Sequence, residues 1–175
     1  MRTDVLEKHI IDTVKEWQMK IGYQNGGMKL YYPGGSLKED LETDDLQNAL
    51  YVFGREVQPR LGKIEITHSG DRYCLDIPEQ GCRAISETVP EPEFLSRLLH
   101  IITAENGTME QVRKCFRDFA EERNTVVVES DETEHEAGCV FYFEDGKTDE
   151  YVYCVEENEF GLTYHRFSRA DYEVL

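Results

Sequence analysis

The chain has 175 residues, of which 39% are hydrophobic and 11% aromatic, so its composition excludes an intrinsically disordered protein. Acidic residues outnumber basic ones by 36 to 19, and the resulting charge of −17 disfavours direct binding to nucleic acids or anionic membranes. No apolar run approaches the ~20 residues of a membrane span, and no apolar signal segment opens the chain. We therefore expect a cytoplasmic protein without a membrane partner.

The first predicted element is an amphipathic helix over residues 3–21, in which apolar residues recur at steps of three and four. Gly22 is expected to end this helix. A short strand is predicted over residues 28–32, up to Pro33. The apolar stripe of the helix comprises Leu6, Ile10, Val14, Trp17 and Ile21.

Two further helix starts follow the strand. Ser36 and Glu39 have the spacing of a capping box, which predicts a short helix with Ser36 at its N-cap. A second start near Thr43 predicts a longer helix with an apolar stripe. Pro59 is expected just past the end of that helix, because proline has no backbone N–H to donate.

The segment that follows changes to the alternation typical of strands. Strands are predicted over residues 64–68, 72–77 and 82–85, with turns rich in glycine, aspartate and proline between them. Together they predict a three-stranded antiparallel meander.

The second half of the chain is predicted to hold two helices and a second meander. Residues 94–102 and 109–119 carry apolar stripes, and Thr108 is a suitable N-cap for the second helix. A short terminal helix is expected after Ser168. The predicted strands are 125–129, 139–143, 151–155 and 162–167.

These elements predict an α+β fold in which antiparallel β-meanders pack with four or five helices. We expect a single domain over residues 1–175, with two lobes, 1–87 and 88–175, as the alternative. Residues 73–81 and 153–161 share a Tyr-Cys pair followed by glutamate and glycine at a constant offset of 80 residues. The match suggests a duplicated helix-and-meander unit; alternatively, both segments are hairpins that use tyrosine and glycine for ordinary reasons.

The chain also contains, in this order, Ile21-Gly22-Tyr23, Leu30-Tyr31-Tyr32-Pro33, Leu61-Gly62 and Tyr164-His165-Arg166-Phe167. This succession resembles a family of uncharacterised proteins from anaerobic Firmicutes that is classed as a domain of unknown function. The resemblance spans nearly the whole chain and implies a bacterial, cytoplasmic protein. It carries no activity, cofactor or catalytic residue to this sequence.

The Tyr-His-Arg-Phe stretch is the first candidate site. On a strand, His165 and Phe167 share one face, and Tyr164 and Arg166 share the other. As a functional site, Arg166 would bind a carboxylate or phosphate while His165 transfers a proton. The structural alternative is that Arg166 pairs with an acidic residue on the neighbouring strand and His165 is a half-buried sheet residue.

The second candidate is the segment Glu129–Glu136, which holds five carboxylates and one imidazole and could attract a hard cation. It lacks the glycine and ligand spacing of an EF-hand, so solvated acidic residues are the favoured interpretation, and we predict no metal and no cofactor. The chain has no nucleophile-elbow, zinc-protease or phosphate-loop motif. The sequence leaves open whether Cys154 and His165 come together as a Cys–His dyad in the fold. We assign no catalytic residue.

The third candidate is the final sheet, where tyrosines such as Tyr153 and Tyr164 alternate with acidic residues such as Glu156. Residues 124–175 hold 14 acidic and 3 basic residues. Tyrosine supplies contact area and acidic residues steer a positively charged surface, so this combination suits a basic protein partner. The alternative is a sheet with one buried aromatic face and one solvated acidic face.

Our leading hypothesis is a non-enzymatic interaction module that binds a basic protein through its acidic C-terminal sheet. A competing hypothesis is a small-ligand-binding protein or enzyme that uses His165 and Arg166 in a cleft. A third is a structural subunit. The sequence does not determine the oligomeric state.

Overall fold

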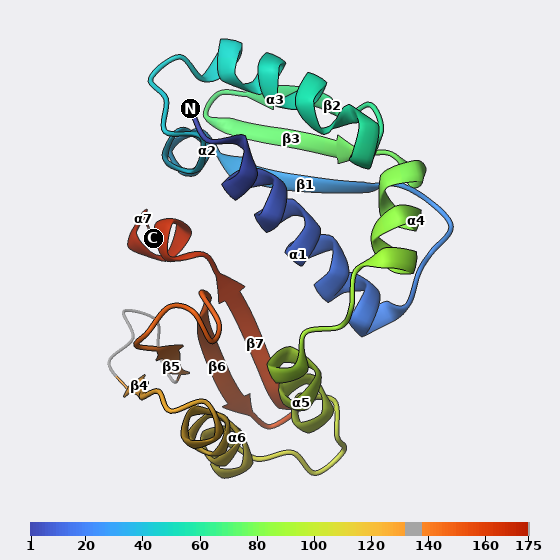
Figure 1. Cartoon of the computed structure of the whole chain (residues 1–175). Coiled ribbons are helices and arrows are strands. Elements are labelled where there is room, and N and C mark those ends of the chain that lie inside the picture. The colour runs from blue at the N-terminus through green and yellow to red at the C-terminus, as the bar shows by residue number, and fades with distance from the viewer. Residues whose placement is uncertain (132–137, 175) are drawn as a thin grey trace. The chain divides into compact units, whose positions relative to one another are not determined.

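The computed structural model describes residues 1–131 and 138–174. These residues form seven helices and seven strands, with the strands in two antiparallel sheets (Figure 1). They divide into two compact units, Met1–Glu91 and Pro92–Glu173, which we call unit 1 and unit 2. The predicted α+β class is confirmed, although more helices form than the four or five expected.

Unit 1 combines four helices with a three-stranded antiparallel sheet in the order β1-β3-β2. One face of this sheet is apolar, because Leu30 of β1 lies opposite Leu75 of β3 and both side chains are buried. Tyr31, which follows Leu30, faces the other way and is 54% exposed. The elements are α1 (Thr3–Ile21), β1 (Met28–Pro33), α2 (Gly34–Leu41), α3 (Leu46–Leu61), β2 (Glu65–Ser69), β3 (Arg72–Ile77) and α4 (Glu79–Thr88).

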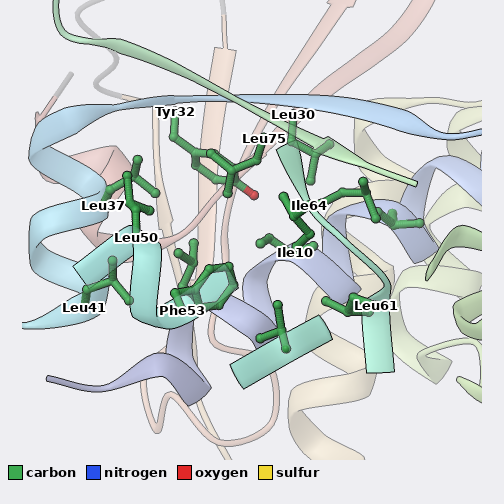
Figure 2. Close-up of a cluster of buried hydrophobic side chains, with 14 of the residues drawn as sticks. Ile10, Leu30, Tyr32, Leu37, Leu41, Leu50, Phe53, Leu61, Ile64 and Leu75 are labelled. Carbon is green, nitrogen blue, oxygen red and sulfur yellow. The ribbon is translucent and has the colours of Figure 1, made fainter. Parts of the chain in front are cut away.

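The core of unit 1 lies between the apolar sheet face and the helices. Figure 2 shows Ile10 of α1 and Phe53 of α3 pointing toward Leu30 and Leu75 of the sheet. Phe53 and Leu75 have no exposed surface, so they contribute their full side-chain area to the hydrophobic stabilisation of the unit.

The helix α1 has the predicted bounds, and Gly22 ends it with a φ of 77°. The predicted stripe is wrong at its far end, because Trp17 is 44% and Ile21 55% exposed. The half-buried Gln18 makes the contact there instead, because its side-chain amide donates to the Cys82 carbonyl at 2.8 Å. This face of α1 therefore binds α4 through a polar contact that an apolar stripe does not reveal.

Two predicted helix boundaries are wrong. The helix α2 begins at Gly34, whose amide donates to the Asp71 carbonyl at 2.8 Å, so Ser36 lies inside the helix and is buried rather than capping it. Pro59 lies within α3, which continues to Leu61 and ends at Gly62. A proline in the last turn removes only one late hydrogen bond, and the helix closes through the Gly62 amide and the Gln58 carbonyl.

The predicted third strand at residues 82–85 is also wrong, because this segment lies within α4. Pro78 precedes the helix and Glu79 opens it, and both are favoured at a helix start. The third strand of the sheet is instead β1, which pairs with β3 over its whole length. The proposed duplication fails for the same reason: residues 79–81 begin a helix, whereas 159–161 form a turn that leads into a strand.

Unit 2 packs two helices on one face of a four-stranded meander in the order β4-β5-β6-β7, as predicted. Phe94 and Phe116 of the helices contact Phe143 and Tyr153 of the sheet, with ring centroids 5.0 to 5.7 Å apart. Thr108 forms the predicted cap as part of a capping box. The elements are α5 (Glu93–Ile102), α6 (Met109–Glu122), β4 (Val127–Ser130), β5 (Gly138–Phe143), β6 (Val152–Asn158), β7 (Gly161–Phe167) and α7 (Arg169–Val174).

Across residues 1–131 and 138–174, none of the helices combines the length and the apolar composition needed to cross a bilayer.

Candidate functional site

The Tyr-His-Arg-Phe stretch lies on β7, and its side chains alternate as the sequence predicts. The His165 ring stacks near Phe167 at a centroid distance of 6.1 Å, so these two share a face. Arg166 faces the other way, with its guanidinium 4.2 Å from the Tyr151 ring centroid. A ligand lying on one face of this sheet would therefore contact only one of His165 and Arg166.

Tyr153 of β6 belongs to the aromatic core of unit 2. It is fully buried, and its hydroxyl donates to Asp149 at 2.7 Å. Burial raises the pKa of the Tyr153 hydroxyl well above its usual value, the nearby Asp149 carboxylate raises it further, and Arg166 opposes both. Tyr164 stacks beside it at 6.4 Å. Tyr153 therefore stabilises the sheet and has no surface to offer a partner.

Cys154 and His165 lie directly opposite each other on β6 and β7. Burial raises the pKa of the Cys154 thiol, and the negative charge of Glu156 raises it further. A nucleophilic cysteine needs a lowered pKa, so this pair has the proximity of a Cys–His dyad without its electrostatics.

The acidic residues of the C-terminal segment are distributed over several surfaces. Arginines of α6 pair with two of them, since Arg117 lies 3.0 Å from Glu129 and Arg113 lies 3.4 Å from Asp131. Alternation along the strands places Glu156 on the sheet face opposite α5 and α6. On the described strands of unit 2, it is the one carboxylate of that face.

Most of the Glu129–Glu136 cluster, residues 132–136, lies outside the described residues. Within residues 1–131 and 138–174, no three His, Cys, Asp or Glu side chains are arranged to hold a metal ion.

A groove in unit 1 lies between α3 and the β2–β3 hairpin, with a volume of about 560 Å³. This size is within the range of ligand-binding pockets. Buried Leu50 and Ile64 contribute apolar surface to it. The remaining lining side chains come from α3, β2, β3 and the α3–β2 connection: Gln47, Tyr51, Gly54, Arg55, Gln58, Lys63, Ile66, His68 and Tyr73.

Gly54 keeps the helix side of this groove open. A Cβ added at this position meets no atom within 4 Å, so a larger side chain would extend into free space along the groove. A glycine inside a helix destabilises it by about 0.5–1 kcal/mol relative to alanine. Gly54 therefore lowers the stability of α3, although the surrounding packing leaves room for a larger residue.

Aromatic rings and positive charges line the two sides of the groove. Tyr51 is 65% exposed, and the Arg55 guanidinium lies 5.9 Å from its ring centroid. Across the groove, the His68 ring stacks on Tyr73 at 5.0 Å. Lys63 adds a second permanent cation.

The groove contains no carboxylate among the described residues that line it, although the chain has 36 acidic residues. Glu56 of α3 turns away and accepts a hydrogen bond from Thr3 of α1 at 2.6 Å. Within residues 1–131 and 138–174, neither Arg55 nor Lys63 has an ion-pair partner, whereas Arg60 and Arg83 of the same unit do. The two groove cations are therefore available to a ligand.

A family described as "Domain of unknown function, E. rectale Gene description (DUF3877)" matches residues 3–175. The chain belongs to this family. The match confirms the resemblance to a Firmicutes family that the Tyr-His-Arg-Phe stretch and its companions indicated. Neither a curated protein nor a solved structure matches this DUF3877 member.

The sequence interpretation did not identify the groove. Gly54 within an otherwise regular apolar stripe was one available signal, because glycine is disfavoured there. The second was the pair Tyr51 and Arg55, which are four residues apart on the exposed side of the same helix. The contribution of His68 and Tyr73 required knowledge of how the hairpin packs on α3.

Proposed function

We propose that this DUF3877 member is a binding module that takes an anionic ligand with an apolar part in the groove of unit 1. The supporting observation is the groove itself, which combines an apolar base with two unpaired cations and excludes carboxylates. Such a site selects a ligand by charge and by shape, because an apolar group fills the base while an anionic group reaches Arg55 or Lys63.

The charge distribution agrees with this placement. Unit 1 holds 16 acidic and 11 basic residues, whereas unit 2 holds 20 and 8. A negative surface repels anions over distances of about 10 Å at 0.1 M salt, so an anion site is better placed in the less acidic unit.

The test is a fluorescence titration with 8-anilinonaphthalene-1-sulfonate, an anionic aromatic probe, against the wild type and Gly54→Leu. Leucine fills the groove and also favours the helix, so we expect probe binding to weaken at least tenfold while the protein stays folded. Gly35→Leu is the matched control, because Gly35 is an exposed helical glycine with no neighbour within 4 Å. Equal probe binding by wild type and Gly54→Leu would overturn the proposal.

A second candidate is the binding of a basic protein by unit 2, which the excess of 20 acidic over 8 basic residues supports. Partners recovered on immobilised protein at low salt should be lost at high salt, since exposed charges are then screened. A bacterial, cytoplasmic setting is part of both proposals.

A further inference from the structure

The strand β2 forms one edge of the unit 1 sheet. Residues of β2 line the groove together with residues of α3. One side of β2 pairs with β3 from Glu65 to Ser69. No described strand pairs with its other side. The side chains of Ile66 and His68 line the groove. An open edge strand beside a groove is the arrangement in which an added strand can gain both backbone hydrogen bonds and side-chain contacts.

The hairpin geometry identifies which backbone groups of β2 face outward. Gly70 and Asp71 form a two-residue turn, Gly70 has a φ of 58°, and Ser69 pairs with Arg72 on either side of it. In such hairpins the pair next to the turn is hydrogen-bonded, and bonded pairs alternate with non-bonded pairs along the ladder. The N–H and C=O groups of Ile66 and His68 therefore point away from β3.

We propose that the groove receives an extended acidic segment of a partner polypeptide, which adds a strand to β2. The proposal rests on the proposed function, because it names the occupant of the same groove. Positive charge at Arg55 and Lys63 requires an anionic occupant. The outward backbone groups of Ile66 and His68 favour an occupant with regularly spaced hydrogen-bond donors and acceptors of its own. An extended polypeptide has such groups.

The geometry also specifies the side chains of the added segment. Residues opposite Ile66 and His68 point toward α3, and they are two positions apart because strand side chains alternate. One of them should be apolar, so that it packs near Leu50. The other should be aspartate or glutamate, so that it reaches Arg55 or Lys63. The residue between them faces away from the groove and is unconstrained.

The experiment uses capped hexapeptides with a Ser/Thr background, in which an acidic and an apolar residue stand two apart in both orders. Fluorescence anisotropy measures their binding to the full chain. The best binder is then made in two N-methylated forms, one methylated at the groove-facing apolar residue and one at its neighbour. Only the first loses a donor to β2, so it should bind about tenfold more weakly while the second binds like the parent.

Charge reversal tests the acidic position. Arg55→Glu should weaken binding of the parent peptide about tenfold and strengthen binding of the same peptide with lysine in place of its acidic residue. Arg72→Glu is the control, because Arg72 lies on the other sheet face, 4.9 Å from the exposed Tyr31 ring. This variant changes the net charge equally and should leave peptide affinity unchanged.

The two proposals fail differently. If no peptide binds although the naphthalenesulfonate probe binds and Gly54→Leu blocks it, the added strand is wrong and the anion site stands. Equal affinity of the two N-methylated peptides leads to the same conclusion. If Gly54→Leu changes neither probe nor peptide binding, both proposals are wrong.

Discussion

Replacing Gly54 with alanine should stabilise the protein. Gly54 lies in the interior of α3, and an added Cβ meets no atom within 4 Å, so the methyl group introduces no clash. The helix then gains the difference in propensity between alanine and glycine, about 0.5–1 kcal/mol. Alanine also reduces the conformational freedom of the unfolded chain, which acts in the same direction.

Thermal unfolding followed by far-UV circular dichroism measures this gain. A stabilisation of 1 kcal/mol should raise Tm by about 4–8 °C if the 91-residue unit 1 unfolds by itself, and by about 2–4 °C if both units unfold together. Gly35→Ala, at the exposed start of α2, provides the comparison. A lowered Tm for Gly54→Ala would refute the reasoning, since position 54 would then need glycine for its backbone rather than for the space beside it.

Three further predictions concern stability. Phe53→Ala removes a fully buried ring and should lower the free energy of unfolding by about 3–5 kcal/mol, whereas Tyr51→Ala, on the exposed side of the same helix, should change it by less than about 0.5 kcal/mol in urea unfolding. Thr108→Ala breaks the capping box and should lower stability by about 1 kcal/mol, and an unchanged Tm would contradict the role of the cap. The raised pKa of Tyr153 means that the unfolded chain releases this proton first, so its contribution to stability is complete below pH ~10 and decreases as pH rises above that. Tyr153→Phe should flatten that alkaline decrease, although losing the hydrogen bond to Asp149 lowers stability at neutral pH.

Local signals predicted the second half of the fold well. The unit 2 meander joins strands that neighbour each other along the chain, so alternation and turn residues define both the strands and their pairing. Thr108 caps α6 as its residue type predicted, because its side-chain oxygen accepts from the Gln111 backbone amide. Gly22 ends α1 because glycine readily adopts a positive φ.

Predictions that depended on distant partners failed. The segment 82–85 is too short for its apolar pattern to distinguish a strand from a helix. We expected this segment to pair with β3, but β1 pairs there instead. Trp17 belongs to the helical stripe by spacing, but it is exposed, and the neighbouring half-buried Gln18 makes the contact with α4 instead. The groove exists only because α3 packs beside the β2–β3 hairpin. The sequence could therefore indicate single residues of the groove, such as Gly54, but not the groove itself.

The pairing of β1 with β3 has a consequence for how the protein is made. Residues 34–71 separate the two strands, so β1 leaves the ribosome well before its partner. At 5–20 residues per second, the delay is roughly 2–8 s. During that time Leu30 and Tyr32 have only the helices α1, α2 and α3 to pack against, as each is made, and the nascent β1 presents an unpaired backbone. During synthesis, the sheet of unit 1 therefore forms by slow pairing of strands that are distant in the sequence. In unit 2, each strand after β4 can pair with the preceding strand soon after it is made.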